Sequence, residues 1–91
     1  MKKAVRVYFS GLVQGVFFRA FIQEQAEKLN LVGFVRNIEN GRVEAFLEGD
    51  HNNVDKMLEI CKKGPKHSKV DNLEVKEEKV QDLKGFKILH I

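Results

Sequence analysis

The sequence predicts an α+β fold in which two amphipathic helices cover one face of an antiparallel β-sheet. The main evidence is that hydrophobic residues switch between the alternating period of a strand and the longer period of a helix along the chain. A second indication is Asn40-Gly41, which separates two alternating stretches and is the strongest short signal of a β-hairpin. The third is the length of 91 residues, which suits a single domain over residues 1–91.

The first strand is predicted over residues 5–13, where apolar side chains alternate with others. After Gly15 the apolar residues recur at intervals of four and three, at Phe18, Ile22, Ala26 and Leu29. This spacing predicts an amphipathic helix that begins near Arg19. Asn30 suits the left-handed conformation that commonly ends a helix.

A hairpin is predicted next. Residues 31–38 are rich in Val, Phe and Leu and form its first strand. In the second strand, around residues 43–48, the apolar residues alternate with a set that we expect on the face away from the core, namely Glu44, Phe46 and Glu48. Asp50 follows this strand and can cap the next helix.

The second helix carries an apolar stripe at helical spacing, made of Val54, Met57, Leu58 and Cys61. Gly64-Pro65 ends this helix. Two more strands are predicted at residues 70–75 and 86–91, joined by a charged segment around Glu77, Glu78 and Lys79. The order β-α-β-β-α-β with a short C-terminal strand is the split βαβ, or ferredoxin-like, arrangement.

The composition is typical of a folded globular protein and narrows its partners and compartment. Lys and Arg outnumber Asp and Glu by 16 to 13, and the net charge of +3 favours anionic ligands without indicating nucleic acid. The single cysteine excludes an internal disulfide, so we expect a reducing compartment, the cytoplasm. The longest uncharged run, residues 7–18, is shorter than the roughly 18 residues of a membrane helix, and Arg6 interrupts the stretch that could start a signal peptide.

Residues 14–19 join the first strand to the first helix and are a candidate anion site. The first backbone N–H groups of a helix lack partners within it and lie at the positive end of its dipole, where phosphate binds well. Gly15 lets the backbone wrap closely around an anion, and Arg19 adds a planar fork of donors that matches phosphate oxygens. The segment is neither a P-loop nor a dinucleotide fingerprint. On these residues alone, a tight turn with a solvated arginine remains an alternative.

The same segment, GLVQGVFFR at residues 11–19, resembles the acylphosphatase signature G-x-V-Q-G-V-x-F-R. Residues 29–37, LNLVGFVRN, resemble that family's L-G-L-x-G-W-V-R-N. Shorter similarities follow at residues 40–44, 64–65 and 86–88. The chain departs from the family pattern without losing a group expected to do chemistry, at Asn30 in place of glycine, Phe34 in place of tryptophan and Lys66 in place of proline.

The resemblance implies a ferredoxin-like fold and the hydrolysis of acyl phosphates to a carboxylate and inorganic phosphate. Arg19 would bind the phosphoryl group, and Asn37 would orient the attacking water. The phosphate cradle implied by the motif consists of Gln14, Gly15, Val16, Phe17, Phe18 and Arg19. The carboxylate leaving group is stable near pH 7 and needs no general acid, and neither a metal nor another cofactor is expected. Without the motif, Asn37 would be interpreted as a turn residue beside the hairpin.

The expected partners are a small acyl phosphate as substrate and inorganic phosphate or sulfate as a competing anion. We expect a monomer that binds neither nucleic acid nor a membrane. RNA binding is the main alternative, because RNA-recognition domains share this fold and stack bases on aromatic residues of the open sheet face. Tyr8 and Phe46 could share such a face, but the neighbouring glutamates and the missing aromatic motif argue against it. A phosphate-binding module without activity is a third interpretation, which the retained Arg19 and Asn37 disfavour.

Other reactive side chains have simpler explanations. Cys61 lies on the apolar stripe of the second helix and is expected to be a core thiol. Arg36 is expected to lie on the surface of its strand without a role in the chemistry. The three histidines do not have the sequence spacing of metal ligands with Cys61; they are His51, His67 and His90. Four lysines form a basic cluster at the end of the second helix, namely Lys62, Lys63, Lys66 and Lys69. We expect this cluster to be solvated and to attract anionic substrate only weakly, if at all.

Overall fold

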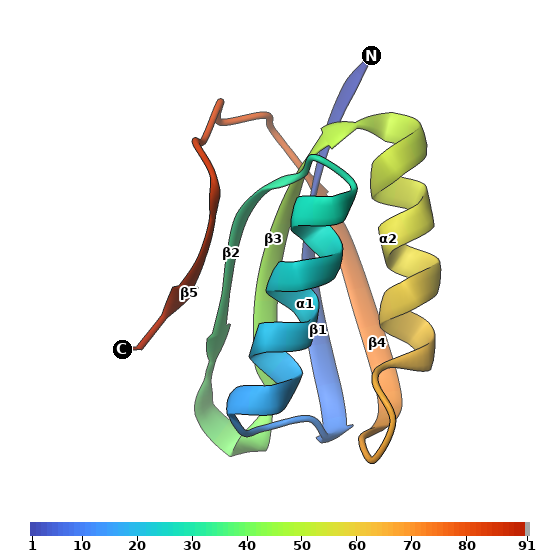
Figure 1. Cartoon of the computed structure of the whole chain (residues 1–91), viewed down its shortest axis with the longest axis vertical. Coiled ribbons are helices and arrows are strands. Elements are labelled where there is room, and N and C mark those ends of the chain that lie inside the picture. Colours follow the sequence, from blue (N-terminus) through green and yellow to red (C-terminus); the bar gives the residue numbers. More distant parts are fainter. Residues whose placement is uncertain (91) are drawn as a thin grey trace.

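The computed structural model describes residues 1–90 and confirms the expected order of elements (Figure 1). Five strands and two α-helices follow one another, with a short 3₁₀ turn inside the hairpin. Their bounds are β1 Lys2–Leu12, α1 Val16–Lys28, β2 Val32–Asn37, η1 Glu39–Gly41, β3 Val43–Asp50, α2 His51–Lys63, β4 Lys69–Glu78 and β5 Phe86–Leu89.

Four strands form an antiparallel sheet, and a fifth strand extends it in parallel. The strand order is β4-β1-β3-β2-β5, and β5 runs parallel to β2. Glu78 at the end of β4 pairs with Ala4, and both Ala4 and Val32 at the start of β2 pair with Glu48. Because β4 ends where β2 begins, the connection over residues 79–85 crosses this end of the sheet and delivers β5 in the direction of β2 (Figure 1). The expected antiparallel sheet therefore has one parallel edge.

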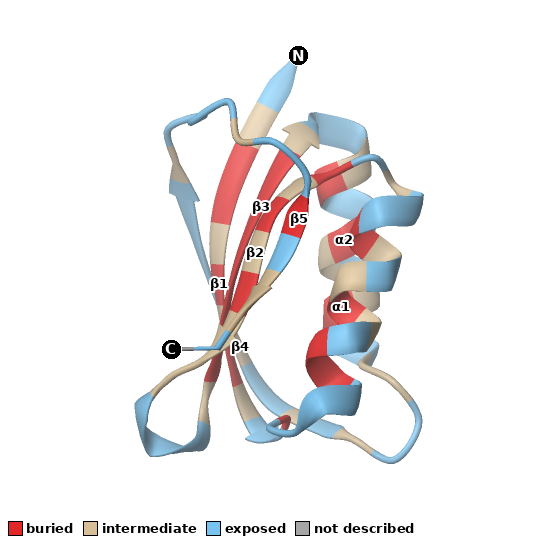
Figure 2. Cartoon of the chain, turned by 60° about the vertical axis from the view of Figure 1, so that its left-hand side comes forward, coloured by how far each residue is buried: buried red, intermediate tan, exposed pale blue. Residues whose placement is uncertain are grey.

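Both helices pack on the same face of the sheet, and the hydrophobic core lies between the two layers (Figure 2). Alternate residues of β1 and β3 meet the apolar stripes of α1 and α2 there, among them Val7, Phe9, Ile22, Leu47 and Met57. Cys61 is fully buried in this core, and burial raises the pKa of its thiol to about 12. A thiol in this state is a poor nucleophile, which confirms the expectation of a core cysteine.

Several element boundaries differ from those expected. Helix α1 begins at Val16 and not near Arg19. The prediction missed its first turn because Val16 and Phe17 are apolar but exposed, and so lie outside the buried stripe from which the helix was predicted. Strand β4 extends to Glu78, which was expected in a connection, and Arg6 of β1 holds this residue with a hydrogen bond of 3.0 Å. Strand β5 ends at Leu89, so His90 is not part of it as expected, and Ile91 lies outside the described residues.

The expected turns and caps are present. The Asp50 carboxylate accepts a hydrogen bond from the backbone N–H of Asn52 at 3.1 Å and caps α2. Asn30, directly after α1, has a left-handed φ of 57°. Asn40 and Gly41 in the hairpin both have positive φ angles, 65° and 75°, as the short signal at this pair indicated.

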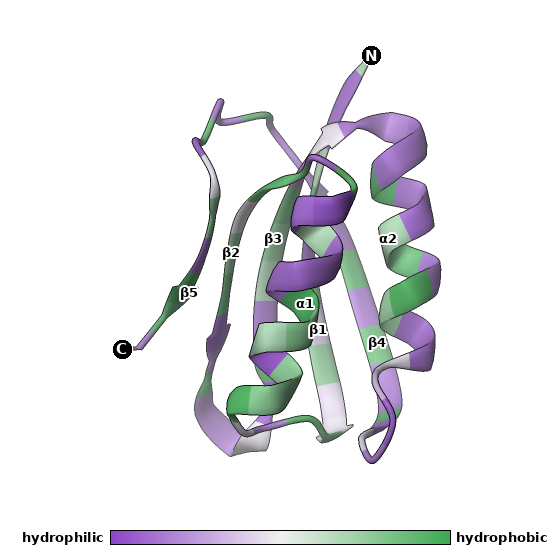
Figure 3. Ribbon diagram, in the orientation of Figure 1, coloured by the Kyte–Doolittle hydropathy of each residue, from purple (hydrophilic) through white to green (hydrophobic). Residues whose placement is uncertain are grey.

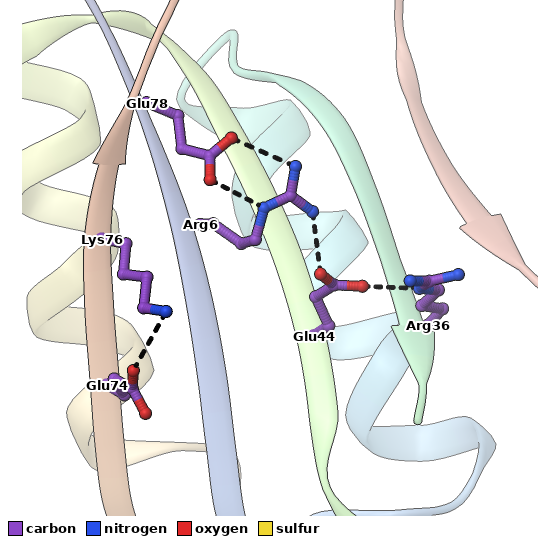
Figure 4. A network of polar contacts seen from close by, with 6 residues as sticks. All are labelled: Arg6, Arg36, Glu44, Glu74, Lys76 and Glu78. Carbon is purple, nitrogen blue, oxygen red and sulfur yellow. Dashed lines mark hydrogen bonds and ion pairs between the residues drawn. The ribbon is translucent and has the colours of Figure 1, made fainter. Parts of the chain in front are cut away.

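An ion-pair network lies on the outer face of the sheet and covers part of it (Figure 4). Arg6 donates to Glu44 at 2.8 Å and to Glu78 at 3.0 Å, and Arg36 also donates to Glu44. Although burial opposes ionisation, the hydrogen bonds from Arg36 and Arg6 hold the pKa of Glu44 below its ordinary value. Arg36, which was expected only to lie on the surface of its strand, is thus part of this ion-pair network.

Phe46 and Glu48 lie on the face away from the core, as expected, but both are buried there. Phe46 stacks on Phe34 with the ring centroids 5.9 Å apart, and the Arg6 guanidinium lies 5.3 Å from the Phe46 ring. The Glu48 carboxylate accepts the backbone N–H groups of Gln81 and Leu83, at 2.6 and 3.0 Å. Bases could stack on Phe46 only after Arg6 and its partners moved away, which is a physical argument against an RNA-binding face.

Candidate active site

The loop between β1 and α1 lies at one end of the sheet and leads into a helix whose start is not capped by a side chain. Gly15 is the N-cap residue of α1 and has a φ of 114°, a conformation that side-chain-bearing residues rarely adopt. Within residues 1–90, no side chain caps this helix start and no acidic residue lies in the first turn of α1. A Cβ atom added at Gly15 would meet no other atom within 4 Å, so this residue is not crowded by its neighbours. The free amide groups of such an uncapped turn are suited to bind an anion.

Arg19 lies in this first part of α1, and its side chain points inward. The residue is only 8% exposed, and Nη1 lies 3.3 Å from Nδ1 of His90. A guanidinium nitrogen can only donate, so Nδ1 of His90 is the acceptor of this hydrogen bond. The Arg19 Nε is buried and finds no hydrogen-bond partner in the described part of the chain. A buried donor on a cation is costly to leave unsatisfied, which points to an anionic ligand.

Asn37, the last residue of β2, supplies a second unsatisfied group of opposite character. Its Oδ1 is buried and lacks a hydrogen-bond partner among residues 1–90. An amide oxygen is an acceptor, so this atom can hold a donor such as water. The site therefore combines a buried free donor on Arg19 with a buried free acceptor on Asn37.

Strand β5 brings Arg19 and Asn37 to the same end of the sheet. Leu89 of β5 pairs with Arg36, the residue before Asn37, and the residue after Leu89 is His90, which contacts Arg19. This arrangement depends on contacts between residues that are far apart in the sequence. The His90 contact was not predicted from the sequence, because nothing in the local pattern connects a histidine after the last strand with the first helix.

Gln14 fixes the loop to the hairpin that carries Asn37. Its side-chain Nε2 donates to the backbone carbonyls of Ile38 at 3.2 Å and Arg42 at 3.1 Å. These two hydrogen bonds use the N–H donors of the Gln14 side-chain amide. Gln14, expected as a member of the phosphate cradle, therefore also connects the loop to the hairpin, which the sequence pattern did not indicate.

The other residues of the expected cradle differ in what they expose. The Phe18 ring is buried and packs edge-on against Phe9, with the centroids 5.1 Å apart. Val16 and Phe17 are 62% and 87% exposed. Their amide groups belong to the uncapped turn, whereas their side chains project into solvent beside it.

Two grooves flank this loop. The first, of about 730 Å³, is called the polar groove and is lined by Gln14, Arg36, Asn37, Ile38, Glu39 and Arg42. The second, of about 410 Å³, is called the apolar groove and lies between Leu12, Gln14, Gly15, Phe17 and Phe18 on one side and residues 65–68 on the other. Gln14 borders both grooves, so they meet at the loop.

The other features considered in the sequence do not form a second functional site in the described part of the chain. Residues 1–90 contain no group of three or more His, Cys, Asp or Glu side chains arranged to bind a metal ion. Neither α1 nor α2 has the length and hydrophobicity of a membrane-spanning helix. Within the basic cluster, Lys62 pairs with Glu59 at 3.1 Å, whereas Lys66 lines the apolar groove.

Comparison with known proteins connects this site to a family. The family model for acylphosphatase matches residues 5–88. An acylphosphatase from Rubrobacter xylanophilus is 48% identical over 87 residues, which cover 94% of this chain and 79% of the relative. One from Syntrophus aciditrophicus is 44% identical, with 99% and 95% of the two chains covered. The crystal structure of acylphosphatase from Bacillus subtilis matches with a TM-score of 0.91 and 38% identity, covering 98% of this chain and 99% of the other.

The fold and these similarities together define a small ferredoxin-like hydrolase. The expected resemblance is confirmed over nearly the whole chain. The chain belongs to the acylphosphatase family, whose activity is the hydrolysis of acyl phosphates.

Proposed function

We propose that Asn37 and Arg19 carry the acyl phosphate hydrolysis of this chain, by positioning a water molecule and the phosphoryl group for in-line attack. The observation that carries this proposal is the pair of buried, unsatisfied groups of opposite character, Arg19 Nε and Asn37 Oδ1. A donor fixed on a cation fits a phosphate oxygen, and a fixed acceptor fits a water hydrogen. Both groups are held in place before substrate arrives.

Arg19 and the amide groups of residues 15–19 supply the positive charge in this mechanism. The start of α1 is uncapped and its dipole favours a negative group. With Nη1 engaged by His90, Nε of Arg19 remains available for a phosphate oxygen. Phosphoryl transfer requires mostly positioning and charge stabilisation, so this set of groups is chemically sufficient without a metal or another cofactor.

Asn37 positions the nucleophile. The Oδ1 accepts a hydrogen bond from water and directs its oxygen toward phosphorus. The new bond forms between the water oxygen and phosphorus, and the bond between phosphorus and the acyl oxygen breaks. The acyl group leaves as a carboxylate, which is stable near neutral pH, and the proton lost by the water ends on phosphate or in solvent.

Hydrolysis of benzoyl phosphate in ¹⁸O-labelled water tests this function directly. Attack at phosphorus places the label in inorganic phosphate and none in benzoate. Label in benzoate would show attack at the carbonyl carbon and would contradict the proposed role of the site. The absence of hydrolysis would indicate a phosphate-binding module without activity.

We also propose which anions compete with substrate, the oligomeric state and the cellular compartment. Inorganic phosphate and sulfate compete with substrate because they fit the same cradle. The Arg19 and Asn37 groups come from one chain, so the proposed site needs no second subunit, and we propose that the protein acts as a monomer. The single, buried, free Cys61 suits a reducing compartment, and we place the protein in the cytoplasm.

A further inference from the structure

We propose that Gln23 and Glu48 are positioning residues for the phosphate site. They hold residues 79–90, called the strap, so that its last residue keeps Arg19 oriented toward the phosphoryl group. This inference rests on the proposed function, because it takes Arg19 to bind the phosphoryl group. Neither Gln23 nor Glu48 lines the polar or the apolar groove, so both act on the site from a distance.

Helix α1 contacts the strap at both ends of β5. The Gln23 Nε2 donates to the backbone carbonyl of Phe86, the first residue of β5, at 3.0 Å. The Arg19 Nη1 lies 3.3 Å from Nδ1 of His90, the residue after β5. Because Arg19 and Gln23 are four residues apart, they lie on one side of the helix. The Gln23 contact therefore fixes the start of the short strand whose end meets Arg19.

The first part of the strap is fixed by hydrogen bonds and not by the hydrophobic core. Residues 79–85 are mostly hydrophilic (Figure 3), and apart from Leu83 they are exposed. Their backbone is held by Glu48, which is only 1% exposed and accepts the N–H groups of Gln81 and Leu83 at 2.6 and 3.0 Å. Burial of a carboxylate is costly, and these charge-assisted hydrogen bonds offset that cost while they fix the connection.

Strand β5 depends on these two anchors because it is short and lies at the edge of the sheet. It has four residues and pairs with β2. The Phe86 side chain at its start is buried in the core, whereas His90 beyond its end is exposed. Parts of a fold with few buried contacts open most readily. The position of His90, and through it that of the Arg19 guanidinium, is therefore sensitive to the anchors upstream.

The test is a double-mutant cycle on the binding of inorganic phosphate, which an NMR titration measures as a Kd without requiring turnover. Gln23→Leu removes the donor to β5, and Glu48→Gln removes the charge while keeping one oxygen as an acceptor. Each is made with and without His90→Ala. With His90 present, we expect each variant to weaken phosphate binding about two- to fivefold, the scale of one hydrogen bond. In the His90→Ala background the same changes alter the Kd less than about 1.5-fold, because the contact that carries the effect is already absent.

A matched control and a folding check accompany the cycle. Gln25→Leu, at the other glutamine of α1, leaves the phosphate Kd unchanged. Urea midpoints establish that each variant is folded. Should Glu48→Gln fail to fold, the cycle of Gln23→Leu with His90→Ala decides the question by itself.

The possible failures are distinguishable. An equal loss of phosphate affinity with and without His90→Ala shows that the two residues act through the general stability of the fold, which overturns the inference. Unchanged phosphate binding in folded Gln23→Leu overturns it as well, while the proposed function stands. A wild type that binds no phosphate contradicts the proposed function itself, and with it the positioning role of the strap.

Discussion

The Nη1 of Arg19 lies 3.3 Å from Nδ1 of His90, which joins the first helix to the residue after the last strand. This hydrogen bond engages one edge of the guanidinium and leaves Nε as the buried, unsatisfied donor. Arg19 thus has few orientations open to it before a ligand binds. Holding a group in its working geometry in advance is a recognised source of catalytic power.

His90→Ala removes the acceptor that orients Arg19. Because one hydrogen bond is worth about 1 kcal/mol, we expect kcat/KM for acyl phosphate to fall about fivefold. His90→Asn restores part of the loss, since its side-chain oxygen can occupy the place of Nδ1. His51→Ala, at a histidine that contacts the Met1 carbonyl instead, serves as the control. Equal rates in His90→Ala and the wild type would show that Arg19 needs no support from the C-terminal strand.

Gln14→Met keeps the size of the side chain but removes both hydrogen bonds to the hairpin. We expect the hairpin that carries Asn37 to loosen, so that kcat falls more than KM rises. Steady-state kinetics checks this split, with Gln25→Met in α1 as a matched substitution outside the loop. A change confined to KM would instead make Gln14 a contact for substrate.

Arg19→Gln removes the charge and the planar fork while keeping an amide. We expect kcat/KM to fall more than about a hundredfold, the scale of a lost charge-stabilising donor. Inhibition by phosphate and sulfate should disappear with it, which an inhibition titration measures. Lys28→Gln, at an exposed cation in the last turn of α1, controls for net charge. If Arg19→Gln retained normal inhibition by phosphate, the anion site would lie elsewhere.

Glu44→Gln tests the network on the outer face of the sheet. The hydrogen bonds from Arg36 and Arg6 hold the pKa of Glu44 below its ordinary value of 4.5 despite its burial. The unfolded chain therefore binds this proton at a higher pH than the folded chain, and the contribution of Glu44 to stability is lost as pH falls below that value. We expect the variant to be less stable by about 2 kcal/mol at pH 7, and the difference to shrink toward pH 3. Urea unfolding across this range measures it, and a constant difference would contradict the account.

Much of the fold could be predicted from the sequence because its elements are encoded by local periods. The apolar stripe of α2 ends on a buried Cys61 as the spacing indicated, and Asp50 caps this helix. The start of α1 was misplaced because Val16 and Phe17 are apolar yet exposed, so the hydrophobic pattern there reflects the site and not the core. A local departure of this kind is expected where residues serve a ligand.

The parts that could not be predicted depend on contacts between distant segments. Nothing local indicates that Glu48 holds the backbone of Gln81 and Leu83, or that β5 enters in parallel. The burial of Phe46 likewise requires Arg6 from a neighbouring strand to cover its ring. For the site, the motif indicated Arg19 and Asn37, whereas the contact of His90 with Arg19 required the completed sheet.

The most direct test of the central claim is the kcat of Asn37→Ala with benzoyl phosphate. The variant lacks the acceptor for the attacking water but keeps Arg19 and the helix start, so kcat should fall about a hundred- to a thousandfold while phosphate still inhibits with its normal affinity. Asn72→Ala, at an exposed asparagine of β4, controls for the substitution, and equal urea midpoints control for folding. A wild-type kcat in correctly folded Asn37→Ala would contradict the proposed mechanism.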